Sequence, residues 1–135
     1  DLAAEFWCAV SDQMPDWELA RKREVSAADL RSEYVHAHSL ALSAIARAGN
    51  TLLQKHKRGW KSKLNNLSNI DWSRNNTKLW EGRAMSAGHL SKKTVNVMLT
   101  ANVLKRELGL ALTAEENETE KDFRSNGNVR RKRKS

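Results

Sequence analysis

Five basic side chains surround two tryptophans between residues 70 and 93 and could bind phosphate groups. They are Arg74, Lys78, Arg83, Lys92 and Lys93. Arg and Lys neutralise the phosphates of a nucleic-acid backbone, which supplies the sequence-independent part of the affinity. The segment ends at Ser91, the predicted start of a helix, where unpaired amides and the helix dipole favour an anion. The alternative is that the lysines are an ordinary solvated surface and that the two arginines pair internally with Asp71 and Glu81.

A second basic cluster closes the chain and has the composition of a phosphate-neutralising arm. It consists of Arg130, Arg131, Lys132, Arg133 and Lys134. If all five charges displaced counterions from duplex DNA, the logarithmic salt dependence of binding would change by about 4.5. Residues 126–135 repel one another and have almost no apolar side chains, so we expect a disordered basic tail unless it is bound. The alternative is a tail that only improves solvation.

The other residue types that perform chemistry do not form a recognisable site. His36 and His38 would diverge by about 200° on a helix and could not share a metal ion. His56 and His89 have no cysteine or acidic residue at ligand spacing, and Cys8 has no evident base. No glycine-rich phosphate loop is present either. We therefore expect no catalytic residue, no metal site and no cofactor, and we predict that the chain is not an enzyme.

Three tryptophans, Trp60, Trp72 and Trp80, lie within or beside the basic segment. They could stack on bases, as aromatic side chains do in proteins that bind single strands. In a small helical domain, however, an indole is more often buried with its N–H bonded to a backbone acceptor. We expect Trp72 and Trp80 to belong to the core.

The formal net charge of +8 is distributed unevenly along the chain. Residues 55–106 carry +10, whereas the flanking residues 1–54 and 107–129 are acidic, at −3 and −4. Such a field attracts polyanions, with nucleic acid as the main candidate and an anionic membrane surface as the weaker one. The lone Cys8 cannot form an internal disulfide, and no signal peptide or membrane-spanning run is evident, which favours a cytoplasmic protein.

The composition and periodicity predict an all-α fold. At 135 residues the chain suits one domain, and the alternation of β-branched and aromatic residues that strands require is missing. We predict a small multi-helix bundle, residues 1–125, around a central alanine-rich helix at about 27–48 that Ser26 caps and that breaks or kinks at Gly49-Asn50. A second buried helix is predicted at about 92–108, capped by Ser91.

Shorter elements should surround these two helices. Near the N-terminus we expect a helix from Leu2 to Met14 that Pro15 closes, and a helix at 17–24 capped by Asp16. A basic helix around Trp60, Leu64 and Leu67 and a helical turn near 77–85 should follow. The last element is an acidic helix that begins with a capping box, Thr113 to Glu116, and fades by Asn126. The helix at 92–108 would expose Asn96, Lys105 and Arg106. Its broad apolar face nevertheless favours burial over a role as a recognition helix.

The central part of the chain resembles a known family. The runs that carry the likeness are VSAADLRSEYVHAHSLALSAIARAGNTLL, D-W-S-R-N-N, W-E-G-R-A-M, G-H-L-S-K-K and KRELGLALTAEE, within Val25 to Glu116. They resemble the C-terminal part of the DNA sulfur modification protein DndB family. The DGQHR motif of the N-terminal part of such proteins is absent, and the chain begins at Asp1, so we expect a C-terminal fragment of a larger protein.

The resemblance implies a bacterial DNA-binding transcriptional regulator of the genes for phosphorothioate modification of DNA. Double-stranded DNA would be its partner, in the cytoplasm at the nucleoid, together with the missing N-terminal region and a second copy of the chain. No membrane partner is expected. The alternative is a protein-interaction or dimerisation module without direct DNA contact, in which the alanine-rich helix and the Phe6-Trp7 helix dock a partner.

Overall fold

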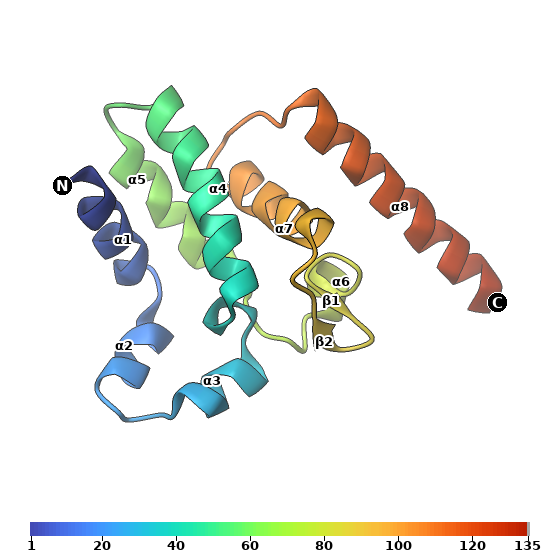
Figure 1. Ribbon diagram of the computed structural model, residues 1–135, viewed down its shortest axis with the longest axis horizontal. Helices are drawn as coiled ribbons and strands as arrows, with labels where there is room; N and C mark the ends of the chain where they lie inside the picture. Colours follow the sequence, from blue (N-terminus) through green and yellow to red (C-terminus); the bar gives the residue numbers. More distant parts are fainter. Residues whose placement is uncertain (135) are drawn as a thin grey trace.

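Two helices, α4 (Ser39–Lys55) and α7 (Thr94–Glu107), pack side by side at the centre of the molecule (Figure 1). The computed structural model describes residues 1–134, with the side chains of residues 1–125. Around the central pair lie α1 (Leu2–Asp12), α2 (Pro15–Arg21), α3 (Ala27–Glu33), η1 (Val35–Ala37), α5 (Trp60–Leu64), η2 (Asn65–Asn69), α6 (Thr77–Trp80), the strands β1 (Met85–Ser86) and β2 (His89–Leu90), and α8 (Ala114–Lys134). The predicted all-α bundle is confirmed, with one two-stranded hairpin added in the described part.

Small side chains let α4 and α7 approach closely. Ala41, Ala44 and Ala48 of α4 are fully or almost fully buried, as is Ala101 of α7. Alanine at these positions leaves room for a neighbouring helix, as the sequence predicted for the alanine-rich segment. The apolar core continues outward from this contact to α1, α5 and the segment that carries the hairpin.

The alanine-rich helix begins later than predicted, because the range 27–48 contains α3, the 3-10 turn η1 and the first part of α4. Ser26 does cap α3, accepting a bond from the Asp29 amide at 3.0 Å. The chain then becomes extended at Tyr34, whose backbone forms an isolated antiparallel bridge with Ser73, and the Val35 amide donates to the carbonyl oxygen of Trp72 at 2.8 Å. These partners are distant in sequence, and they take backbone groups that a continuous helix would use.

The predicted break at Gly49-Asn50 is wrong, since α4 continues to Lys55. Gly49 is buried against the ring of Phe6 from α1, and a Cβ there would overlap the ring, at 2.7 Å from Cε2. Gly49 therefore lies inside α4, where it allows α1 to approach closely, and it does not end the helix.

Several shorter elements differ at their ends. Pro15 is the first residue of α2 and does not close α1, which ends at Asp12, and Asp16 is not a cap because Met14 occupies that position. The basic helix around Trp60 becomes the short helix α5 followed by the 3-10 turn η2, with Trp60, Leu64 and Leu67 buried as expected.

The C-terminal helix α8 extends to Lys134, past Asn126 where the sequence analysis ended it. Its capping box is confirmed, because the Glu116 amide donates to the Thr113 hydroxyl at 3.1 Å and the Glu116 carboxylate accepts from the Thr113 amide at 2.9 Å. The predicted disorder of residues 126–135 in the absence of a bound partner stays a prediction. Among the helices that are described, none has the length and apolarity needed to cross a bilayer.

Candidate nucleic-acid interface

The segment that carries the predicted cations is fixed to the core by its two tryptophans. Trp72 and Trp80 are buried and their rings stack, with centroids 5.3 Å apart and planes 16° from parallel. The Trp80 indole N–H donates to the carbonyl oxygen of Asp71 at 2.9 Å. The expectation that both tryptophans belong to the core is therefore confirmed.

Arg74 ties this segment to two other parts of the chain. Its guanidinium donates to the carbonyl oxygen of Arg31 at 2.9 Å and to that of Gly88, at the tip of the hairpin, at 2.6 Å. Its amide donates to the carbonyl oxygen of Glu33 at 2.8 Å. Arg74 is half-buried, and it acts first as a positioning residue for the hairpin.

The hairpin turn is closed from inside by a carboxylate. Ala87 and Gly88 both have positive φ, 52° and 79°, the geometry of a tight hairpin turn. The Glu81 carboxylate accepts from the amides of these two residues at 2.6 and 3.3 Å. Asp71 likewise accepts from the Ser73 amide at 3.0 Å. Neither carboxylate pairs with Arg74 or Arg83, so the internal pairs considered for Asp71 and Glu81 are not formed.

Lys78, Lys92 and Lys93 are exposed on this fixed segment. Lys78 lies on α6, while Lys92 and Lys93 connect β2 to the start of α7. The cap of α7 is Lys93, which has no side-chain capping bond, and Ser91 is not the cap. The Ser91 hydroxyl donates to the side-chain oxygen of Asn96 at 2.7 Å. The uncapped first turn of α7 thus lies beside two exposed ammonium groups.

Arg83 is placed differently from the other four cations of this segment. It is 7% exposed, and its guanidinium holds the Glu120 carboxylate of α8 with two bonds of 2.8 and 3.1 Å. It also donates to the carbonyl oxygen of Leu99 at 2.8 Å and lies over the ring of Phe123, 4.5 Å from the centroid. Arg83 is therefore not exposed on the open surface in this structure, and its predicted contact with DNA stays a prediction.

The predicted exposure of Asn96 and Lys105 on the helix at 92–108 is wrong. Lys105 is 3% exposed and Asn96 is 9% exposed, and only Arg106 of the three predicted residues is exposed. The side-chain amide of Asn96 donates to the carbonyl oxygen of Arg83 at 2.9 Å. With α4 on one side and α8 on another, α7 cannot enter a groove of DNA as a recognition helix.

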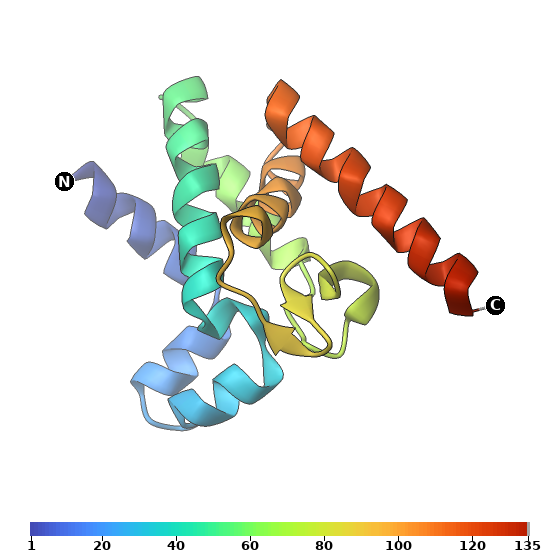
Figure 2. The same ribbon diagram turned by 45° about the vertical axis from the view of Figure 1, so that its right-hand side comes forward.

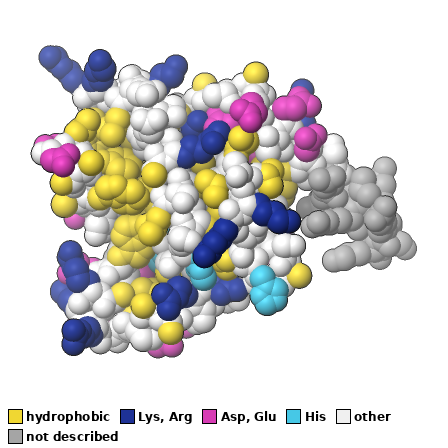
Figure 3. Space-filling model, in the orientation of Figure 1, with side chains coloured by type: hydrophobic (Ala, Val, Ile, Leu, Met, Phe, Trp, Pro, Cys, Tyr) yellow, Lys and Arg dark blue, Asp and Glu magenta, His cyan; other side chains and the backbone are white. Residues whose placement is uncertain are grey.

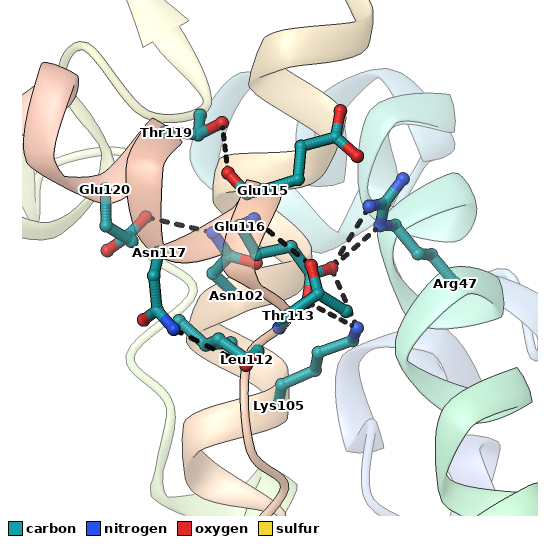
Figure 4. A network of polar contacts seen from close by, with 10 residues as sticks. All are labelled: Arg47, Asn102, Lys105, Leu112, Thr113, Glu115, Glu116, Asn117, Thr119 and Glu120. Atoms are coloured by element: carbon teal, nitrogen blue, oxygen red, sulfur yellow. Dashed lines mark hydrogen bonds and ion pairs between the residues drawn. The ribbon is translucent and has the colours of Figure 1, made fainter.

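Two buried glutamates of α8 form a polar network with α4 and α7 (Figure 4). Burial by itself would raise the pKa of Glu116, but hydrogen bonds from Lys105, the Thr113 amide and Arg47 lower this pKa to about 2. For Glu120 burial likewise opposes ionisation, but bonds from Arg83 and Asn102 hold the pKa below its ordinary value. Both glutamates are therefore charged at neutral pH.

The basic block at 55–106 does not form one surface. At the C-terminal end of α4 lie its last residue, Lys55, and the connection to α5 with Lys57 and Arg58, all three exposed. The hairpin lies near the opposite end of α4 (Figures 1 and 2). On the face drawn in Figure 3, Lys and Arg side chains accordingly lie in several separate groups. The charge of the block is thus divided between two ends of the molecule.

A cavity of about 250 Å³ opens between α2, η1 and the segment before Trp72. The buried His36 lines it, with its Nε2 atom 3.2 Å from the Asp16 carboxylate. The charge of Asp16, followed by burial and the charges of Glu33 and Asp71, raises the pKa of Tyr34 in the same lining. These carboxylates disfavour a phosphate there. Among the residues that the structure describes, no group of three or more His, Cys, Asp or Glu residues could hold a metal ion.

The remaining predicted contacts, Arg130, Arg131, Lys132, Arg133 and Lys134, have side chains outside the described residues and stay a prediction. Sequence comparison gives one result that bears on the rest of the chain. A family model described as DndB, DNA-sulfur modification-associated, matches residues 1–111. No curated protein and no solved structure matches the chain.

Proposed function

Because this chain belongs to the DndB family, whose members are DNA-sulfur modification-associated, we propose that it is a DNA-binding transcriptional regulator of the phosphorothioate modification genes. The observation that carries the proposal is the exposure of Lys78, Lys92 and Lys93 on a segment that stacked tryptophans and Arg74 hold rigid. Because the backbone that carries these lysines is anchored to the core, binding a phosphate has to order only their side chains and not the segment itself, and their charge is opposite to that of duplex DNA.

In this proposal the lysines bind the phosphate backbone of double-stranded DNA, and the tail residues 130–134 add affinity. Recognition is directed to the backbone, because α7 is buried and presents no base-reading face. Arg74 positions the hairpin, and Arg83 is no longer part of the open surface. The role is binding without catalysis or a cofactor, in the cytoplasm at the nucleoid.

The test is fluorescence anisotropy of a labelled duplex at several salt concentrations. Each phosphate contact contributes about 0.9 to the logarithmic salt slope, so the double variant Lys92→Gln/Lys93→Gln should lower the slope by about 2 and weaken binding. The matched control is Lys55→Gln/Lys57→Gln, which removes the same charge from exposed lysines at the other end of α4. Equal affinities and slopes for the two double variants would reject the proposed site.

A second candidate function is a protein-interaction or dimerisation module. Leu2 is 53% exposed and Leu42 is 44% exposed, and Figure 3 shows a hydrophobic area on the side of the molecule where Figure 1 places α1 and α4. Sedimentation at several protein concentrations separates the two functions. Self-association that depends on concentration, without retention of DNA, would favour this second candidate.

A further inference from the structure

Helix α8 inserts two glutamates among cations that belong to other elements. Glu116 is fully buried, and both its carboxylate oxygens lie 2.8 Å from the Lys105 ammonium of α7. The Arg47 guanidinium of α4 donates to the same carboxylate at 3.1 Å (Figure 4). One turn further along α8, Glu120 is 2% exposed and receives two bonds from Arg83.

Glu120 has further partners at the same site. The Arg106 guanidinium lies 3.2 Å from its carboxylate, and the side-chain amide of Asn102 donates to it at 3.1 Å. Four cations from α4, α7 and the segment after α6 thus converge on two carboxylates of α8. The cations all lie within residues 1–111, which match the family model, whereas α8 begins beyond that match.

The contact between α8 and the rest of the molecule is mainly ionic. Over its described residues α8 has one large apolar side chain, Phe123, which packs on Arg83. Buried ion pairs contribute less net stability than their Coulombic attraction suggests, because the loss of hydration offsets part of it. The hydrogen bonding at this contact is also incomplete, since Arg83 Nε and Asn102 Oδ1 are buried without a partner in the described part. Release of α8 should therefore cost much less free energy than global unfolding.

We propose that α8 is a reversible cover over a second phosphate-binding site, formed by Arg47, Arg83, Lys105 and Arg106. Glu116 and Glu120 occupy the positions that two backbone phosphates of a nucleic acid take when α8 is displaced. Carboxylates and phosphates accept the same charge-assisted bonds, and the paired bonds from Arg83 to Glu120 have the geometry in which a guanidinium also holds a phosphate. This inference rests on the proposed function and adds a regulated site to the open lysines.

The cover lowers the affinity of the closed protein for DNA, because only the open fraction can use the second site. The test compares two full-length double variants that each remove two negative charges from α8. Glu116→Gln/Glu120→Gln weakens the buried pairs, whereas the control Glu115→Gln/Glu118→Gln changes exposed residues of the same helix. Both variants gain the same net charge, so general attraction to DNA rises equally in both.

Binding of labelled duplex is measured by anisotropy over a range of salt concentrations. Relative to the control, the variant with the buried changes should bind DNA at least about tenfold more tightly, and its salt slope should be steeper by about 2, as two further phosphate contacts require. Melting curves by circular dichroism serve to check that both variants are folded under the conditions of the binding measurement. Equal affinity and slope in the two folded variants would overturn the inference.

A measurement on the unmodified protein does not depend on any variant folding. Hydrogen exchange of the α8 amides, read by mass spectrometry, should become faster when the protein is saturated with duplex DNA, while the α7 amides stay protected. Unchanged or increased protection of α8 in the complex would overturn the inference.

The two proposals fail in different ways. If Lys92→Gln/Lys93→Gln weakens binding while the buried-glutamate variant equals its control, the open surface stands and the covered site falls. If the unmodified protein does not bind duplex at low salt but the buried-glutamate variant does, the covered site stands and the open surface falls.

Discussion

Gly49 makes room for an aromatic ring of another helix. The Phe6 side chain lies where a Cβ of residue 49 would be, so Gly49→Ala forces the ring or helix α1 to move. Overpacking of a buried site costs about 1–3 kcal/mol, which exceeds the gain of somewhat under 1 kcal/mol in helix propensity from replacing glycine with alanine. We expect a net loss of up to about 2 kcal/mol in the free energy of unfolding, measured with urea.

The control for Gly49→Ala is Ser43→Ala, on an exposed position of the same helix, which should change the free energy of unfolding by less than about 0.5 kcal/mol. A second substitution, Phe6→Leu, should cost less in the Gly49→Ala background than alone, because a smaller side chain relieves the overlap. Additive effects of the two substitutions would show that the ring does not cause the loss.

Individual side chains show where sequence analysis succeeded. Trp72 and Trp80 were expected in the core, and both are there, because a large apolar indole is buried whatever its partners are. Arg83 and Lys105 were expected on the surface, because Arg and Lys side chains are usually exposed. They are buried because the fold brings Glu120 to Arg83 and Glu116 to Lys105. Arg83 and Glu120 are 37 positions apart, and the sequence carries no local signal of their contact.

At the scale of elements, the capping box of α8 gives a second stability test. Thr113→Val removes the hydroxyl that accepts the Glu116 amide and keeps the size of the side chain. Loss of such a cap costs about 1 kcal/mol. Because α8 can open separately, the expected result is faster hydrogen exchange in its first turns and little change in the melting temperature of the core.

Thr119→Val serves as the matched control within the same helix. The Thr119 hydroxyl donates to the carbonyl oxygen of Glu115 at 3.0 Å, a bond inside the helix that caps no free amide. This substitution should leave the exchange of the first turns unchanged. Equal acceleration in both variants would mean that Thr113 does not act as a cap.

Local rules predicted those parts of elements whose partners lie nearby in sequence. The Ser26 cap and the Thr113–Glu116 box involve residues three apart, and both are formed. The break between α3 and α4 could not be predicted, because it depends on backbone bonds that Glu33 and Val35 form with Arg74 and Trp72, much later in the chain. The hairpin was also missed, since its strands are only two residues long and give no alternation.

The pH dependence of stability is a property of the whole molecule and should show two windows. Burial lowers the pKa of His36 below its ordinary value of 6.5, against the opposing bond and charge of Asp16. The unfolded chain then takes up this proton at a higher pH than the folded chain. The contribution of His36 to stability is therefore complete above about pH 6.5 and declines as the pH falls below that value.

The second window belongs to the buried glutamates. The pKa of Glu116 falls from 4.5 to about 2 on folding, and that of Glu120 is also lowered. Their contribution is present above pH 4.5 and is lost as the pH falls towards 2. Urea unfolding measured across this pH range should show that His36→Gln reduces the loss of stability below about pH 6.5. The loss of stability between pH 4.5 and about 2 should be the same as in the unmodified protein.

The exposed His89 offers the matched substitution for this pH experiment. The stability of the His89→Gln variant should fall with pH in both windows as that of the unmodified protein does. If His36→Gln and His89→Gln gave identical pH profiles, protonation of His36 would not be the cause of the upper window.

The distribution of charge over the whole molecule was predicted only in part. The sequence has a block of +10 at residues 55–106, but the fold divides it between the two ends of α4 and buries Arg83 and Lys105 under α8. A charge count along the chain does not contain this information, because acidic residues from another block neutralise the buried cations. Of the five cations predicted around the two tryptophans, Lys78, Lys92 and Lys93 are exposed.

The parallel stacking of Trp72 on Trp80 has a practical consequence. Two indole rings whose centroids are 5.3 Å apart, buried in an asymmetric environment, contribute to the near-ultraviolet circular dichroism of the protein together with Trp7, Trp17 and Trp60. A change in that spectrum that is not accompanied by a change in the far-ultraviolet signal of the helices would report altered packing around the tryptophans. The protein thus carries an intrinsic optical probe, which shows for each lysine variant whether its binding surface has kept its shape.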